Sequence, residues 1–190
     1  MGKEEQMNKL FDEVLKQMQD KLNNETVVIA VSTGVDSMVL FHLLLKLKNV
    51  NIIVAHVNHH QREQSLEEQQ FINDLCKEIN VRCYTKELFF ESHQNFQSNA
   101  RNERYIFFKE VLEKENAKYL ITAHHANDDL ETILMRLIKS TSLKGYAGIE
   151  ELTSWAGKYI YRPLISVSKN NIYSAPSFCI SGGFYEKIIY

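Results

Sequence analysis

The chain has 190 residues, is 44% hydrophobic and carries a formal net charge of −2. These values predict one globular domain with a sizeable core and argue against a protein that binds nucleic acid over its whole surface, while leaving room for a local basic patch. Three cysteines without a C-x-x-C pair suggest neither a disulfide framework nor a zinc site, which favours a reducing compartment. No secretion signal or membrane-length apolar run is present, so we expect a soluble, cytoplasmic protein without a membrane partner.

The first part of the chain alternates between helical and strand patterns. Apolar residues at helical spacing predict an amphipathic helix over residues 4–22. The apolar, β-branched run 27–31 predicts a buried parallel strand, a helical pattern starts at Met38, and residues 52–57 predict a second buried strand. Together they form a β-α-β unit with a right-handed crossover, which places ligands at the C-terminal ends of the strands.

A polar loop with the pattern S-x-G-x-D-S joins the first strand to its helix. Its spacing fits neither a Walker loop nor a Rossmann turn. The N–H groups of a helix N-terminus bind phosphate, Gly34 would let the backbone approach it, and the hydroxyls of Ser32 and Ser37 would donate hydrogen bonds. Asp36 would repel phosphate unless a cation lay between them, so it predicts Mg²⁺. The alternative is that Asp36 and Ser37 only cap the helix.

Three histidines, His56, His59 and His60, lie at the end of the second strand. No cysteine or carboxylate at a matching short spacing completes a metal site with them. We interpret this segment as a polar loop on the nucleotide side of the sheet.

The middle of the chain continues the alternation. A helix is predicted over residues 66–79 with Ser65 as its cap, followed by a third strand over residues 81–88. Residues 89–98 have no clear period and are interpreted as a loop of unassigned function. A helix over residues 99–115 follows.

That last helix carries Arg101 and Arg104 one turn apart, so both lie on one face near its start. They form either a solvated basic face or a set of donors for a triphosphate or an RNA phosphate. Residues 118–123 then predict a fourth strand.

A second informative stretch, T-A-H-H-A-N-D-D-L-E-T, follows the fourth strand. His124, Asp128 and Glu131 are spaced four and three residues apart, so on a helix their side chains can point the same way, toward the Asp36 loop. An imidazole and carboxylates at a phosphate site can hold Mg²⁺, orient a nucleophile or accept its proton. The alternative is that Asp128 and Glu131 only favour the helix dipole and His124 only fills the strand end.

The first loop resembles the pyrophosphate loop of the PP-loop enzymes, the N-type ATP pyrophosphatases, whose usual pattern is S-G-G-x-D-S. Thr33 stands where glycine is usual, and a positive φ there would disfavour threonine. Four further motifs resemble the N-terminal catalytic domain of the tRNA(Ile)-lysidine synthases: A-H-V-N-H-x-x-R at 55–62, A-R-N-x-R-Y-x-F-F at 100–108, T-A-H-H-A-x-D-x-x-E-T at 122–132, and Arg162-Pro163-Leu164.

The resemblance implies a doubly wound α/β fold, with a mostly parallel sheet of about five strands and helices on both faces. It also implies an ATP-dependent ligase. Such an enzyme adenylates O2 of the wobble cytidine of a tRNA(Ile) with a CAU anticodon, and the ε-amine of L-lysine then displaces AMP to give lysidine.

The implied cofactors are ATP and Mg²⁺, with Asp36 as the metal ligand. By position in the motifs, Arg104 and His124 would contact the phosphate or the developing charge, while Asp128 and Glu131 would hold the ammonium group of lysine or orient its attack. The residues of the implied ATP loop are Ser32, Thr33, Gly34, Val35, Asp36 and Ser37.

Two departures from the family pattern concern charge and length. Asn127 stands where an aspartate is frequent and Asp129 where a glutamine is frequent, so one charge has in effect moved. We expect a PP-loop nucleotide-binding catalytic domain over residues 1–173 and a divergent tail over 174–190, which lacks the expected continuation. The chain would then be a shortened form of the enzyme.

Two alternative functions fit parts of the sequence. An altered loop without further RNA-binding domains would suit a nucleotide-binding module without catalysis. A tRNA 2-thiolation enzyme of the same superfamily would need cysteines for sulfur or Fe–S chemistry, and no C-x-x-C is present. The sequence leaves the oligomeric state open, with a homodimer as one arrangement.

Overall fold

The computed structural model describes residues 2–60, 64–89, 96–131 and 148–175. In this part of the chain six strands form one sheet in the order β3-β2-β1-β4-β6-β5. All neighbouring strands are parallel except the pair of β5 and β6, so the predicted doubly wound, mostly parallel sheet is confirmed, with one strand more than expected. The strands are β1 Thr26–Val31, β2 Asn51–Asn58, β3 Arg82–Glu87, β4 Tyr119–Ile121, β5 Leu152–Trp155 and β6 Lys158–Tyr161.

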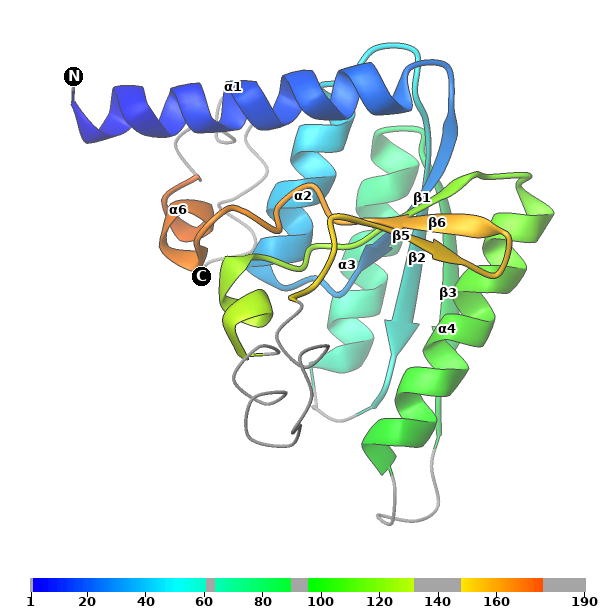
Figure 1. Ribbon diagram of the computed structural model, residues 1–190. Coiled ribbons are helices and arrows are strands. Elements are labelled where there is room, and N and C mark those ends of the chain that lie inside the picture. The colour runs from blue at the N-terminus through cyan, green and yellow to red at the C-terminus, as the bar shows by residue number, and fades with distance from the viewer. Residues whose placement is uncertain (1, 61–63, 90–95, 132–147, 176–190) are drawn as a thin grey trace, which may run out of the picture.

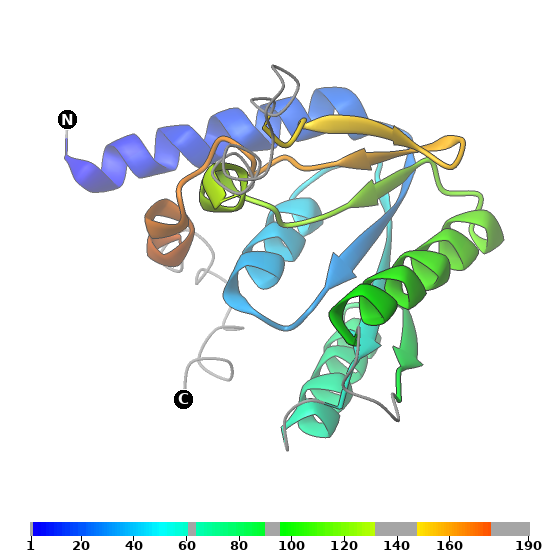
Figure 2. The same cartoon turned by 60° about the horizontal axis from the view of Figure 1, so that its bottom comes forward.

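Helices cover both faces of the sheet (Figures 1 and 2). One apolar core lies between the sheet and α1, α2, α3 and α6, and a smaller core lies beneath α4 on the other face. Among the described helices, none combines the length and apolar composition that a membrane crossing requires. The bounds of the helices are α1 Lys3–Leu22, α2 Val35–Leu45, α3 Ser65–Glu78, α4 Phe96–Lys114 and α6 Lys169–Ser174.

The apolar run of β1 is explained by its central position. Val27, Ile29 and Val31 pack into the larger core, whereas Val28 lies in the smaller core with Ala30 packed against it. Successive side chains of a strand point to opposite faces, so a strand buried on both faces is apolar throughout.

The order in which strands are added to the sheet reverses at β1. The chain runs outward from β1 through β2 to β3, and then returns to the other side of β1 with β4. A parallel sheet of this kind binds ligands at its switch point, outside the carboxyl ends of the two strands that flank it. Here those strands are β1 and β4, which carry the two informative stretches at their ends.

Several element boundaries differ from the prediction. Helix α2 begins at Val35 rather than Met38, so Asp36 lies inside its first turn. Helix α4 begins at Phe96, within the segment expected to be a loop. Ser65 is the first residue of α3, after the N-cap Gln64, and no side chain caps that helix, so the predicted cap is wrong.

The hairpin of β5 and β6 was not predicted from the sequence. Its connecting residues, Ala156 and Gly157, have φ angles of 51° and 74°. Positive φ at both positions is typical of a type I′ turn, for which the usual sequence is Asn-Gly or Asp-Gly. Ala-Gly is a weak indicator of such a turn, and this explains the omission.

Candidate active site

An open cavity of about 270 Å³ lies at the switch point, lined by residues from both strand ends. Ser32, Asp36 and Ser37 come from the end of β1 and the start of α2. His124 and Asp128 come from the segment after β4. Two stretches about ninety residues apart in sequence therefore face one cavity, as predicted.

The β1–α2 loop is held together by its own hydroxyls. Ser37 Oγ donates to the carbonyl of Gly34 at 2.9 Å and accepts from the N–H of Ser32 at 3.1 Å. The hydroxyls of Ser32 and Ser37 also lie 3.2 Å apart. The N-cap of α2 is Gly34, and no side chain caps this helix. The interpretation of Asp36 and Ser37 as simple helix caps is therefore wrong, and the N-terminus of α2 has no side-chain cap.

Thr33 adopts the left-handed conformation, with φ of 62°. This conformation is costly for a β-branched residue and free for glycine, which is the usual residue at this position of the resembling motif. The Thr33 hydroxyl donates to the carbonyl of Ser32 at 2.6 Å. The expected conflict between loop geometry and threonine is thus present, and one local hydrogen bond offsets part of it.

The backbone of Gly34 is ordinary, with φ of −69°. A Cβ placed there would meet only Ser32 Oγ, at 3.5 Å, which is normal van der Waals contact. Neither backbone strain nor crowding inside the chain therefore requires glycine. The small residue leaves room at an exposed helix N-terminus, which suits the close approach of an anion.

Asp36 presents an unused acceptor. Its Oδ1 is buried and has no hydrogen-bond partner among the described residues. In this part of the chain no group of three or more His, Cys, Asp or Glu side chains could hold a metal alone. Mg²⁺ is commonly held by one or two carboxylates together with substrate phosphates, so a single free carboxylate oxygen beside a phosphate-binding helix end fits this ion.

His125 joins the two strand ends. Its Nε2 lies 3.8 Å from Asp36 Oδ2 and its Nδ1 lies 3.3 Å from Asp128 Oδ2, while the side chain is only 6% exposed. The Nδ1 atom has no hydrogen-bond partner among the described residues, and 3.8 Å exceeds hydrogen-bond distance, so the buried ring lies as a spacer between the two carboxylates without a hydrogen bond to either. His125 was not predicted as a site residue.

Asp128 has a structural role as well as a place in the cavity. Residues 126–131 begin a helix, and Asp128 Oδ2 accepts from the N–H of His125, just before that helix, at 2.9 Å. This is the carboxylate half of a capping box. The side chain is 38% exposed, so part of it remains open to a ligand. Asp128 therefore stabilises the start of its helix, as the alternative interpretation expected, and it also lines the cavity.

His124 lies beside Asp128 on the cavity wall. Its Nδ1 is 2.9 Å from the hydroxyl of Thr122. Burial lowers the pKa of His124, the charge of Arg162 lowers this pKa further, and Asp128 acts in the opposite direction. A neutral imidazole with one nitrogen occupied by Thr122 leaves the other nitrogen for a proton or a polar ligand atom.

Two arginines from α4 line the same cavity. Burial lowers the pKa of Arg104, although an arginine keeps its charge at neutral pH. Arg101 places its guanidinium over the ring of Tyr105, with 5.3 Å between the guanidinium carbon and the ring centroid. Arg104 was predicted as a site residue, and the structure shows that Arg101 lines the same cavity.

Not every predicted residue reaches the cavity. Glu131 is exposed, lies one turn beyond Asp128 and is absent from the cavity wall. Thr33, Gly34 and Val35 shape the first loop without lining the cavity. The roles of these residues stay predictions.

Other cavity residues were missed or only partly indicated. His59, from the segment after β2, lines the cavity, and burial followed by the charge of Arg104 lowers its pKa. The sequence indicated this residue only by its position directly after the second predicted strand. Arg62, the histidine-rich segment's arginine, lies outside the described residues.

The two residues that depart from the family pattern, Asn127 and Asp129, both make structural hydrogen bonds. Asn127 Oδ1 accepts from the N–H of Lys169 at 3.0 Å, which ties this segment to the start of α6. Asp129 accepts a hydrogen bond from the N–H of Ile149. Neither residue lines the cavity, so the moved charge leaves its wall unaltered.

Comparison with known sequences adds to this geometry. A family model described as a PP-loop domain matches residues 4–178. The tRNA(Ile)-lysidine synthases of Bacillus cereus and Enterococcus faecalis are 39% and 42% identical to the chain over 170 and 154 residues. These matches cover 85% and 79% of the chain but 36% and 33% of those proteins, so the chain spans about a third of the length of these curated relatives.

Solved structures show the same fold. A U34-tRNA thiolase from Methanococcus maripaludis has a TM-score of 0.73 at 18% identity, covering 92% of this chain and 63% of that one. An FMN adenylyltransferase from Candida glabrata, in complex with ATP, has a TM-score of 0.58 at 15% identity, covering 89% and 54%. With a matching loop, a matching sheet and a family model that spans most of its length, the chain belongs to the PP-loop domain family.

Proposed function

We propose that this chain is the catalytic part of an ATP-dependent ligase that joins L-lysine to the wobble cytidine of a tRNA(Ile) with a CAU anticodon. The observation that carries the proposal is the shared cavity, in which Asp36 from one strand end faces His124 and Asp128 from the other. Relatives at about 40% identity that bear the name tRNA(Ile)-lysidine synthase support the choice of substrate.

ATP would bind with its phosphates at the N-terminus of α2. The N–H groups of the loop and the hydroxyl of Ser32 supply donors, and Arg101 and Arg104 supply positive charge from α4. Asp36 would hold Mg²⁺, which when bound neutralises phosphate charge during the reaction. The cytidine O2 would attack the α-phosphorus, forming an O–P bond as pyrophosphate leaves.

Lysine would then attack the activated cytidine. Its amine loses a proton and forms a bond to C2, while the bond from C2 to the adenylated oxygen breaks and AMP leaves. Asp128 is the carboxylate of this wall that can hold the lysine ammonium group, and Glu131 can extend that negative charge from outside the cavity. His124, kept neutral by its lowered pKa, can accept the proton.

We further propose that residues 1–173 form the catalytic domain, that residues 174–190 form a divergent tail and that the protein works in the cytoplasm. Most of that tail, residues 176–190, lies outside the described residues. A homodimer remains part of the proposal.

A nucleotide-binding module without catalysis is the second candidate, and the strained Thr33 in the phosphate loop is the observation that favours it. Thiolation has less support in the cavity, because the two described cysteines, Cys76 and Cys83, are absent from its wall.

Lysine incorporation into a tRNA(Ile) transcript tests these candidates. We expect the wild-type chain to incorporate radiolabelled lysine with ATP and Mg²⁺, and Asp36→Asn and Asp128→Asn to lose this activity while they stay folded. Tyr173→Ala, which removes an exposed side chain of α6, serves as the control and should match wild type. Nucleotide binding without lysine incorporation would identify the non-catalytic module instead.

A further inference from the structure

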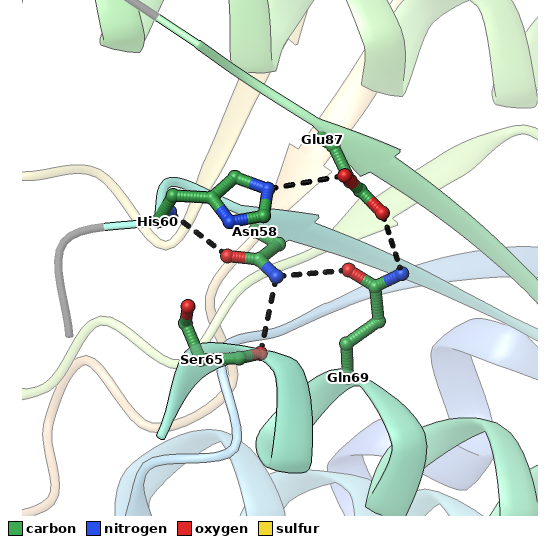
Figure 3. Close-up of polar contacts among 5 residues, drawn as sticks. All are labelled: Asn58, His60, Ser65, Gln69 and Glu87. Carbon is green, nitrogen blue, oxygen red and sulfur yellow. Dashed lines mark hydrogen bonds and ion pairs between the residues drawn. The ribbon is translucent and has the colours of Figure 1, made fainter. Parts of the chain in front are cut away.

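A closed ring of hydrogen bonds lies beside the cavity, at the ends of β2 and β3 (Figure 3). The amide of Asn58 donates to Gln69 Oε1 at 3.0 Å, and Gln69 Nε2 donates to Glu87 Oε1 at 3.3 Å. Glu87 Oε2 accepts from His60 Nε2 at 3.1 Å, and the N–H of His60 donates to Asn58 Oδ1 at 2.9 Å. These four links join the strand ends to α3, and Asn58 also donates to the carbonyl of Ser65 at 3.1 Å.

The ring of hydrogen bonds holds His60 in an unusual conformation. His60 has φ of 51°, and Asn58, which accepts from its N–H, is only 2% exposed. The left-handed conformation is uncommon outside glycine and is kept where surrounding contacts determine it. The imidazole of His60 is therefore fixed in place from both its backbone and its Nε2.

Phe89 lies on top of this fixed imidazole. The two rings are stacked, with centroids 4.3 Å apart and planes inclined by 17°. Leu88, just before Phe89, is buried and its N–H donates to the carbonyl of Asn58 at 2.9 Å, so the backbone leading to Phe89 is also held. Yet the Phe89 side chain is 72% exposed, the largest exposure among the exposed large hydrophobic residues of the described chain.

The stacked pair adjoins the active site. His59, the residue directly before His60, lines the cavity that Arg101 and Arg104 also line. Adjacent Cα atoms lie about 3.8 Å apart, so His60 belongs to the same short segment as this cavity-lining residue. An exposed aromatic ring backed by a fixed ring, in the segment next to a cavity lined by arginines, is the arrangement that binds unpaired nucleobases by stacking.

We propose that Phe89, supported by His60, is a stacking platform for an unpaired base of the RNA substrate that flanks the reacting nucleotide. The proposal rests on the proposed function, since it takes RNA as the substrate. The open face of the Phe89 ring would receive the base, and the ring of hydrogen bonds through Asn58, Gln69 and Glu87 would keep the platform rigid before RNA arrives.

Variants of Phe89 test the platform directly. The probe is an anticodon stem-loop RNA with a CAU triplet in which 2-aminopurine replaces the adenine, so that quenching of its fluorescence reports stacking. We expect Phe89→Ala and Phe89→Leu to weaken RNA binding by about 5- to 100-fold and to lose the quenching, and Phe89→Trp to stay within about 2-fold of wild type. The KM for ATP should be unchanged in all three variants.

The matched control is Tyr173→Ala, which removes another exposed aromatic ring from α6. It should bind RNA like wild type, and thermal unfolding should show that every variant folds. RNA binding that is unaffected by Phe89→Ala and Phe89→Leu, an increase in the KM for ATP instead, or no RNA binding by the wild-type chain would overturn the platform.

The same variants separate the platform from the ligase activity. Phe89-dependent RNA binding without lysine incorporation would support the platform while the proposed ligase fails. Lysine incorporation that Phe89→Ala and Phe89→Leu leave intact would support the ligase and overturn the platform.

Discussion

The two strand ends that meet at the cavity use their carboxylates differently. Asp36, at the end of β1, leaves its buried Oδ1 without a hydrogen-bond partner among the described residues. Asp128, after β4, accepts the N–H of His125 and thereby caps the helix it begins. The first carboxylate contributes little to the fold and is available to a ligand, whereas the second supports both the fold and the cavity. Substitutions should therefore separate activity from stability at one end and combine them at the other.

The largest effect is expected for Asp36→Asn. This change removes the charge that would hold Mg²⁺ at the phosphates, so lysine incorporation should fall by about 10²- to 10³-fold. The free energy of unfolding should change by less than about 1 kcal/mol, because the ion-pair contact between the Asp36 carboxylate and His125 spans 3.8 Å, which is too long for a hydrogen bond. Incorporation assays and urea denaturation measure the two quantities. A fall in stability as large as that of Asp128→Ala would contradict the comparison.

At the other strand end, Asp128→Ala should lower both quantities. Loss of the acceptor for the N–H of His125 should cost about 1 kcal/mol in the free energy of unfolding. Asp128→Asn keeps an acceptor oxygen and should restore most of that stability without restoring lysine incorporation. Equal stability of the alanine variant and wild type in urea denaturation would show that the cap is unimportant.

His125→Ala tests the connection between the two ends. Removing the ring leaves a gap between the carboxylates of Asp36 and Asp128, which can then shift relative to one another, and we expect kcat to fall about 10-fold or more. His125→Gln retains an amide that can donate to a carboxylate, so it should regain part of kcat. Steady-state kinetics and thermal unfolding of both variants separate this positioning role from a general loss of folding. Equal kcat values for the two variants at equal stability would argue against it.

A smaller effect concerns pH. The pKa of His124 lies below its ordinary value of about 6.5, chiefly through burial, so the neutral form persists to lower pH in the folded protein than in the unfolded chain. If neutral His124 accepts the lysine proton, the acid limb of the kcat/KM profile should lie below about pH 6.5. The same shift makes folding stability fall as pH decreases from about 6.5 toward the folded pKa. His124→Asn should abolish this limb, and a limb above pH 7 in the wild-type profile would contradict the assignment.

Thr33→Gly should have the smallest effect, and a favourable one. Glycine relieves the left-handed strain but gains entropy in the unfolded chain, so we expect an increase of only about 0.5 kcal/mol in the free energy of unfolding and a few-fold tighter binding of ATP. Thr33→Ala keeps the strain and loses the hydroxyl contact with the Ser32 carbonyl, which makes it the matched control. Urea denaturation and ATP titration distinguish the two.

Much of the fold could be predicted because burial on two faces leaves a simple pattern. The apolar run of β1 and the helical spacing that follows it identified the central β-α-β unit, and the rule that ligands bind at the C-terminal ends of parallel strands indicated that end of the sheet. The structure adds that β1 and β4 are direct neighbours. The β5–β6 hairpin could not be predicted because its turn is Ala156-Gly157, and the positive φ angles of these residues do not follow from the sequence.

Part of the site could be predicted because the helix that carries a residue determines the direction of its side chain. Asp36, Arg104 and Asp128 are placed by the helices that carry them, and all three line the cavity. His124 and His125 both lie between a strand and a helix, where no period determines direction. The motif indicated His124, whereas nothing in the sequence indicated that His125 lies between both carboxylates. Glu131 followed the helical rule, but it lies too far along its helix to reach the cavity wall.

A crystal structure of the chain with a non-hydrolysable ATP analogue and Mg²⁺ tests the central claim most directly. We expect the phosphates at the N-terminus of α2, the ion on Asp36, and Arg104 and His124 within hydrogen-bond distance of the α-phosphate. A nucleotide bound away from the meeting point of β1 and β4, or one that leaves His124 and Asp128 facing empty solvent, would contradict a single site shared by both strand ends.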